Sequence, residues 1–297
     1  MCGDIEPNLN APSVVPRETA SAEKYWLGID FSGNCRMWRA TTKDSNIWIA
    51  AVSREPALLV SNTLTKVQEL EAEGEPFFKL TSLLKRRRFA AAAVDAPFSV
   101  PHAYLPQGGH GELLDLVAKM QRPKNCPFPA ANDFVCRVLA GRALRGKKPL
   151  RETERSWQKR GVNVRSTLWA GPRGGAAMTS ACLTLLRESE CPVWPWEQAM
   201  TAGLLVEAFP AAQLCHWEMQ YERYNGNDSE ASSARRKLVE SVSARVAPGR
   251  FRQELESSAD ALDAVLCAFA AIAVTSAKLP DLLSGSPDPE GRIAVHE

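Results

Sequence analysis

The chain has 297 residues, of which 45% are hydrophobic and 24% are charged. This is the composition of an ordinary globular protein that is long enough to bury a sizeable core. The net charge of +2 excludes a strong overall basic field, so any binding of nucleic acid must rest on local patches of the surface.

The cysteines, the N-terminal residues and the longest apolar run indicate in which cellular compartment the protein is expected. Eight cysteines are scattered along the chain, and none forms a Cys-x-x-Cys pair. This usage predicts buried thiols in a reducing compartment. Residues 1–24 lack the basic and apolar regions of a signal peptide, and the longest apolar run, 264–275, is too short to span a bilayer. We therefore expect a cytoplasmic protein that begins with a disordered leader over residues 1–24.

The ordered chain begins with a short apolar run. Residues 25–30 read as a buried strand that ends on a carboxylate, Asp30, directly before a Ser-Gly turn. Residues 35–42 and 46–53 are rich in Trp, Ile, Val and Thr and predict two more strands. Helical periodicity follows over residues 62–73 and 77–88. The first part of the chain thus predicts a three-strand meander followed by helices.

Two later apolar runs repeat the pattern of a strand that ends in an acid. Residues 89–94 lead into Asp95, and residues 204–206 lead into Glu207, each shortly before a proline. The stretch between them, about 101–200, contains no linker-like composition and predicts a helical insertion within one domain spanning residues 25–297. Its expected helices cover residues 112–120, 132–144, 152–159 and 176–188.

The last part of the chain carries two further acids. Residues 221–233 predict a loop and residues 235–246 a helix. The final helix has Ser257 or Ser258 as its N-cap and runs to Thr275. Asp260 and Asp263 lie three residues apart, so they share one face of its first turns. The rest of this helix is almost wholly apolar, which predicts that it is buried, and residues 291–295 predict a short strand or tail.

Five carboxylates therefore stand out in the sequence. Parallel strands bring their carboxyl ends to one edge of a sheet, where binding sites form. Acids gathered there repel one another unless cations neutralise them, and hard oxygen ligands select Mg²⁺ or Mn²⁺. Two such ions would activate a water molecule and stabilise the leaving oxygen of a phosphodiester. Taken singly, each acid has another interpretation, as a turn cap, a turn acid or an anion at a helix start. The five are Asp30, Asp95, Glu207, Asp260 and Asp263.

These residues occur in motifs that resemble, in order, those of domain-of-unknown-function family 429 (DUF429), whose members are predicted ribonuclease-H-like nucleases. The motifs are Gly28–Ser32, Val94–Pro97, Val206–Pro210 and Asp260–Ala264, with weaker similarity over 151–161 and 290–293. The resemblance implies an α/β, ribonuclease-H-like fold. Its mixed five-stranded sheet has three antiparallel strands first and parallel strands after them, with flanking helices. The late motif departs from the pattern, because Arg292 stands where an aromatic residue is expected.

The resemblance also implies roles. Asp30 would be the central metal ligand, Asp95 and Glu207 the ligands at the strand ends, and Asp263 the ligand from the helix, with Asp260 as a ligand or supporting acid. We expect a metal-dependent nuclease or phosphodiesterase that acts on nucleic acid. Two rivals remain open. One is an ATP-handling phosphotransferase of the actin/sugar-kinase-like group that uses the turn after Asp30, and the other is a nucleic-acid-binding protein without catalysis.

Overall fold

A computed structural model of the chain describes residues 25–55, 58–144, 148–197, 202–280 and 288–297. The leader expected over residues 1–24 lies outside these described residues. Among the helices of the described part, none is long and apolar enough to cross a membrane. The expected cytoplasmic location stays a prediction.

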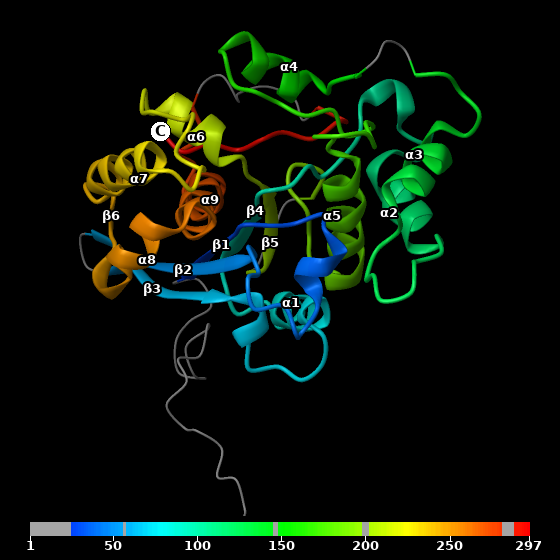
Figure 1. Ribbon diagram of the computed structural model, residues 1–297. Coiled ribbons are helices and arrows are strands. Elements are labelled where there is room, and N and C mark those ends of the chain that lie inside the picture. The colour runs from blue at the N-terminus through cyan, green and yellow to red at the C-terminus, as the bar shows by residue number, and fades with distance from the viewer. Residues whose placement is uncertain (1–24, 56–57, 145–147, 198–201, 281–287) are drawn as a thin grey trace, which may run out of the picture.

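A mixed β-sheet forms the centre of the molecule (Figure 1). Its order across the sheet is β5-β4-β1-β2-β3-β6. β1 lies in the middle, antiparallel to β2 and parallel to β4, while β3 continues the antiparallel meander and β5 the parallel side. The strands are β1 (Tyr25–Ile29), β2 (Trp48–Glu55), β3 (Leu58–Lys66), β4 (Ala91–Val94), β5 (Leu204–Glu207) and β6 (Val246–Ala247).

The antiparallel start and the two parallel strands after it agree with the expectation, but the number of strands does not. The described residues form six strands rather than five, because β6 pairs in parallel with β3 through Leu59 and Val60. This two-residue strand extends the sheet at the meander edge. It was too short to give a hydrophobic pattern of its own in the sequence.

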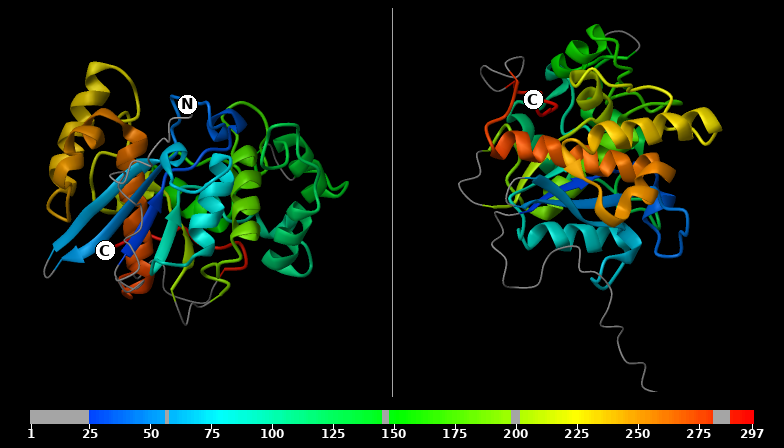
Figure 2. Two further views of the ribbon diagram at one scale, coloured as in Figure 1. Left: turned by 90° about the horizontal axis from the view of Figure 1, so that it is seen from below. Right: turned by 90° about the vertical axis from the view of Figure 1, so that its left-hand side faces the viewer.

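Helices cover both faces of the sheet (Figure 2). Side chains of β1 alternate between the faces, so Leu27 and Ile29 join a core under α1 and α5, whereas Trp26 joins a second core under α9. The helices are α1 (Pro76–Lys85), α2 (Gly109–Ala118), α3 (Ala131–Leu139), α4 (Glu152–Lys159), α5 (Ala176–Ser189), α6 (Pro210–His216), α7 (Ser229–Val242), α8 (Arg252–Ser257) and α9 (Ala259–Thr275). Helices α2 to α5 lie in the stretch of about 101–200 for which the sequence predicts a helical insertion.

The close packing of α9 on β1 depends on one glycine. A Cβ atom placed on Gly28 would lie 1.9 Å from the carbonyl oxygen of Ala264 and 2.5 Å from the amide nitrogen of Ala268. Helix α9 begins after Ser258, whose side chain caps it by accepting a 3.2 Å hydrogen bond from the amide of Ala261. Its alanine-rich face lets the helix backbone rest almost directly on the strand.

Two expected elements of the meander are wrong. Residues 35–42 were expected to be a strand but contain a short 3₁₀ helix, Cys35–Trp38, because the Trp38 indole turns inward and donates a 2.8 Å hydrogen bond to the carbonyl of Ser32. Residues 62–73 were expected to be a helix but contain the end of β3 and a second 3₁₀ turn, Val67–Glu69. Pairing with β2 decides this segment, since the strand forms its hydrogen bonds there.

The cysteines differ in part from expectation, whereas the last segment of the chain takes one of its two expected forms. Cys35 and Cys126 form a disulfide that links the segment after β1 to the insertion, so the expectation that the cysteines are reduced thiols is wrong for this pair. Residues 291–295, expected to be a short strand or a tail, form a tail that runs beside β5, where Ala294 donates a 3.0 Å hydrogen bond to the carbonyl of Glu207.

The contact between Gly28 and α9 yields a prediction. Gly28→Ala should lower the free energy of unfolding by about 3 kcal/mol, because the added methyl group meets helix backbone that cannot move aside. Urea unfolding followed by circular dichroism measures this loss. The matched control is Gly111→Ala in α2, where no atom lies within 4 Å of the new Cβ and a small gain is expected. Equal stability of the two variants would contradict the close packing.

Candidate functional site

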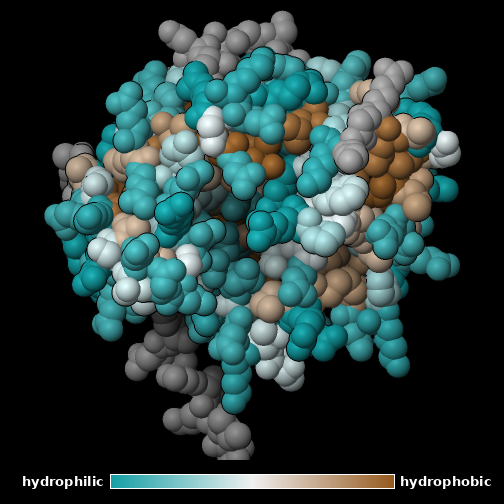
Figure 3. Space-filling view, turned by 45° about the horizontal axis from the view of Figure 1, so that its top comes forward, coloured by the Kyte–Doolittle hydropathy of each residue, from teal (hydrophilic) through white to brown (hydrophobic). Residues whose placement is uncertain are grey.

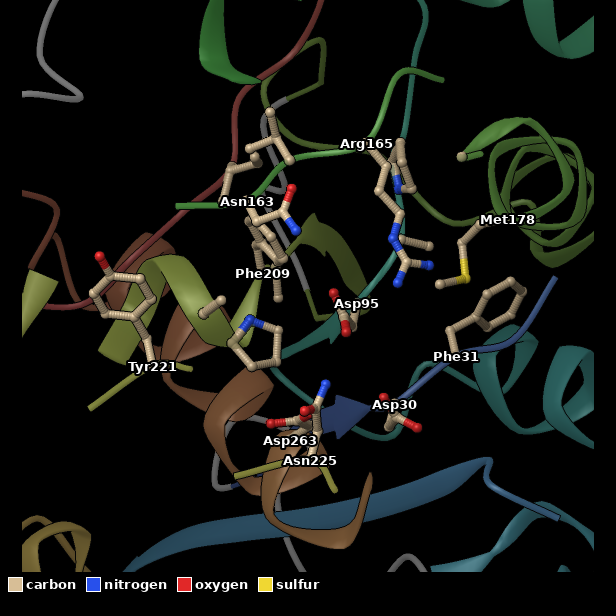
Figure 4. A pocket seen from close by; sticks show the side chains of 18 of the residues that line it. Asp30, Phe31, Asp95, Asn163, Arg165, Met178, Phe209, Tyr221, Asn225 and Asp263 are labelled. Carbon is tan, nitrogen blue, oxygen red and sulfur yellow. The ribbon is translucent and has the colours of Figure 1, made fainter. Parts of the chain in front are cut away.

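Three acids gather at the carboxyl edge of the parallel strands (Figure 4). Asp30 follows β1 and Asp95 follows β4, and the two strands are neighbours, so their ends coincide. The backbone fixes this junction, since the amide of Asp95 donates a 2.9 Å hydrogen bond to the carbonyl of Ile29. Asp263 reaches the same place from the second turn of α9, and Asp260 lies one turn earlier at the start of that helix.

Burial and mutual repulsion change the acidity of this group. Burial raises the pKa of Asp30 well above its ordinary value, and the charges of Asp95, Asp263 and Asp260 raise it further. Burial also raises the pKa of Asp95 to about 7, against the opposing effect of Arg165. The pKa of Asp263 is raised by burial and by Asp95. The acids are therefore close enough to repel one another strongly, which is the condition that a bound cation relieves.

Glu207, the acid at the end of β5, has a different environment from the others. Both of its oxygens accept hydrogen bonds from the guanidinium of Arg151, and Oε2 also accepts one from the amide of Phe98. Arg151 is fully buried and binds Glu154 as well, with 3.0 Å between Nε and Oε1. Burial alone would lower the pKa of Arg151, but the charges of Glu207 and Glu154 raise it above its usual range. Glu207 thus lies beside Asp95 but is held in an ion pair.

A tyrosine and an arginine hold Asp263 in place. The hydroxyl of the buried Tyr224 donates a 2.7 Å hydrogen bond to Oδ1 of Asp263. The loop that carries this tyrosine is fixed by the buried Arg235, which donates to the carbonyls of Tyr224 and Gly226 at 2.6 Å and 2.7 Å and to that of Glu256 at 3.1 Å. One oxygen of Asp263 is therefore oriented by the protein, and the other is left available.

The acids lie in a cavity of about 520 Å³. Arg165 and Met178, both from the insertion, lie on one side of the cavity, while Phe209 and Tyr221 lie on the other side, with Asn163 next to Phe209. This volume lies in the range typical of sites for a small ligand. The face of the molecule shown in Figure 3 is largely hydrophilic, with smaller apolar patches between the polar side chains.

Two oxygen atoms that belong to residues lining the cavity lack hydrogen-bond partners. They are Oδ2 of Asp30, which is only 6% exposed, and Oδ1 of Asn46, and both atoms are buried. Buried oxygens without a partner are costly, and each calls for an explanation such as a bound ion or water. Within the described residues, no three His, Cys, Asp or Glu side chains stand in a ready metal-binding arrangement. The donor set fits a hard cation by its chemistry, since it consists of carboxylate and amide oxygens.

Sequence reasoning found the acids but missed the residues that support them. Asp30, Asp95, Asp260 and Asp263 were identified because each marks the end of a strand or the start of a helix. Asn46, Tyr224 and Arg165 lie in connecting segments whose partners are far away along the chain. No local pattern distinguishes them, so only the assembled fold could identify them.

The raised pKa values of the acids mean that ionising them lowers the stability of the folded protein, and replacing one acid by a neutral residue should remove this loss. Below about pH 4 the folded and unfolded states both hold these protons, and as the pH rises to about 7 the unfolded state loses them first, so stability falls. In metal-free buffer at about pH 8, Asp95→Asn should therefore be more stable than the parent by at least about 1 kcal/mol, and the gain should shrink toward about pH 5. Urea unfolding at both pH values tests this, with the exposed Asp44→Asn as the control that should show no gain.

The comparisons with known proteins identify one family. No curated protein and no solved structure was found to match the chain. One family model does match, over residues 28–284, and its description is "Protein of unknown function (DUF429)". That match spans the segments that carry Asp30, Asp95, Glu207, Asp260 and Asp263, together with the insertion between them. The chain therefore belongs to the DUF429 family.

Proposed function

We propose that this protein is a metal-dependent phosphodiesterase or nuclease with a ribonuclease-H-like fold, which hydrolyses nucleic acid at the cavity above Asp30. The order β5-β4-β1-β2-β3 supports the fold, because it combines an antiparallel meander with two parallel strands on the other side of the central β1. The positions of Asp30, Asp95 and Asp263 at the carboxyl edge support the site.

The environment of one oxygen atom of Asp30 gives the strongest support for a bound metal ion. Oδ2 of Asp30 is buried without a hydrogen-bond partner, although it sits among three other acids that repel it. The raised pKa of Asp30 means that, without a cation, this carboxyl holds a proton more readily than an exposed one, and a bound cation would take the place of that proton. An oxygen without a hydrogen-bond partner, set among other carboxylates, has the chemistry that a site for Mg²⁺ or Mn²⁺ requires.

In this proposal Asp30, Asp95 and Asp263 hold the divalent ions, with Asn46 and Asp260 beside them. The ions, when bound, activate water for attack on phosphorus and stabilise the leaving oxygen. Tyr224 orients Asp263 through its hydrogen bond, and such supporting contacts tune the affinity of a metal site. Glu207 supports the edge of the site through its ion pair with Arg151, rather than acting as a primary ligand as the sequence predicted.

The rival assignment to an ATP-handling phosphotransferase receives less support. It requires the turn after Asp30 to be open to phosphate groups. A Cβ atom on Gly33 would instead lie 2.4 Å from the amide nitrogen of Met178, so this glycine serves the close packing of the turn against α5. The second rival, a binding protein without catalysis, differs from our proposal in turnover and is separated from it by the experiment below.

The first test replaces the proposed ligands. Asp30→Asn and Asp263→Asn should each weaken Mn²⁺ binding, measured by titration calorimetry, and lower hydrolysis of a nucleic acid that the parent cuts by about 100-fold or more. Asp44→Asn, on the surface, should leave both unchanged. If neither acid affects metal binding or hydrolysis, the assignment fails. Tight binding of nucleic acid by the parent without turnover in Mg²⁺ or Mn²⁺ would favour the binding protein.

The second test concerns Tyr224. Tyr224→Phe removes only the hydroxyl group that orients Asp263, so Mn²⁺ affinity should fall about 10-fold or more while the fold is kept. Tyr221→Phe is the matched control, because this tyrosine comes from the same loop but its hydroxyl forms no hydrogen bond with any of the acids in the described structure. Equal Mn²⁺ affinities of the two variants would remove Tyr224 from the site.

A further inference from the structure

The cavity is lined by a positively charged side chain, Arg165, that has no role in the proposed metal site. Arg165 belongs to the segment between α4 and α5 and is exposed, yet it lines the same cavity as the acids. Figure 4 shows its guanidinium group directed toward Asp95. Its charge lowers the pKa of that acid, which confirms that the two groups are near each other. Among the ion pairs and side-chain hydrogen bonds of the described residues, none involves Arg165.

Hydrogen bonds of the neighbouring residues fix the backbone on both sides of Arg165, so the position of its Cα atom is well defined. The neighbouring Ser166 is buried, its hydroxyl donates a 2.6 Å hydrogen bond to the carbonyl of Pro149, and its own carbonyl accepts a 3.0 Å bond from the amide of Gly175. On the other side, the amide of Val162 donates to the carbonyl of Trp157. A guanidinium held in this way, with its donors free, is suited to bind a phosphate group in a bidentate manner.

The buried arginine that lines the cavity, Arg151, cannot take this role. Arg151 is surrounded by Glu207 and Glu154, so its donors are already used. Arg223 lies on the opposite side, in the loop that carries Tyr224, and is exposed. Arg165 is therefore the cation that faces the acids from the wall formed by the insertion.

The burial of Asp30 bears on which form of nucleic acid can reach it. Asp30 is 6% exposed and lies at the floor of a cavity of about 520 Å³, between the wall of Arg165 and the wall of Phe209 and Tyr221. A cavity of this size accepts a ligand of small-molecule dimensions. In a continuous duplex each backbone phosphate is flanked by the paired strand, so a single strand can approach the recessed Asp30 more closely. Enzymes that act on a base inside a duplex face a similar restriction, and they use single strands or nucleotides drawn out of the duplex.

We propose that the site takes an unpaired nucleic-acid strand and that Arg165 binds a backbone phosphate of this strand next to the acids. This inference rests on the proposed function and adds the substrate class to it. Phe209 and Tyr221, which are partly exposed on the opposite wall, offer aromatic surface against which a base of the entering strand can stack.

The experiment measures binding by fluorescence anisotropy in Ca²⁺, with single strands of about 12 nucleotides as probes, one DNA and one RNA, and with the same strands paired to their complements. The parent should bind a single strand at least about 10-fold more tightly than its duplex. Arg165→Ala should weaken single-strand binding about 10-fold and reduce the slope of log affinity against log salt by about one. Arg165→Lys should restore part of the affinity, since it keeps the charge.

The control is Arg137→Ala, which removes an exposed arginine of α3 outside the cavity and should leave binding unchanged. Equal binding of single strand and duplex, or equal effects of the Arg165 and Arg137 variants, would overturn the inference. Titration of the parent with Mn²⁺ alone separates this failure from that of the proposed function. Intact Mn²⁺ binding with no strand preference removes only the inference, whereas absent Mn²⁺ binding removes both.

Discussion

The site depends on the repulsion between carboxylates that the core packing forces together. Gly28 lies two residues before Asp30, and the carbonyl of Ala264, directly after Asp263, lies where a side chain on Gly28 would be. The residues at which β1 and α9 come into close contact are therefore near neighbours in sequence of the two acids. A side chain at this glycine would separate the helix from the strand, and with them the two carboxylates. The packing of α9 on the sheet therefore supplies the energy that keeps desolvated acids together.

The cations near this edge divide the acids into two groups. Arg151 is buried between Glu207 and Glu154 and forms an ion pair with each, so that group ties β5 to α4. Asp30, Asp95 and Asp263 have no such partner among the described residues, and the exposed Arg165 only approaches Asp95. Breaking the first group would leave a buried charge, which is strongly destabilising, whereas neutralising an acid of the second group relieves repulsion. Neutralising an acid of the first group should therefore lower the stability of the protein, and neutralising an acid of the second group should raise it, although both groups lie at the same edge of the sheet.

The sequence revealed the parts of the site that follow from strand and helix boundaries. An apolar run that ends in an acid identifies Asp30, Asp95 and Glu207, and the capped start of α9 identifies Asp260 and Asp263. It did not reveal that Glu207 is paired with Arg151, because that arginine comes from a segment 56 residues away along the chain. Likewise the end of β3, from residue 62 onward, was taken for the start of a helix, since its pairing with β2 outweighs the local pattern. What the sequence could not supply are the contacts made between distant segments.

The sheet and the insertion contribute different residues to the cavity. The sheet and α9 provide the acids, and they would do so in any chain that keeps the strand order and the glycine under the helix. The segment between α4 and α5 provides Asn163 and Arg165, and the start of α5 provides Met178, so residues of the insertion line the cavity beside the acids. The disulfide from Cys35 to Cys126 joins this insertion to the turn that follows Asp30. If the chemistry belongs to the sheet, then the choice of substrate belongs to the insertion, and changes in the insertion should alter which strands are bound before they alter metal binding.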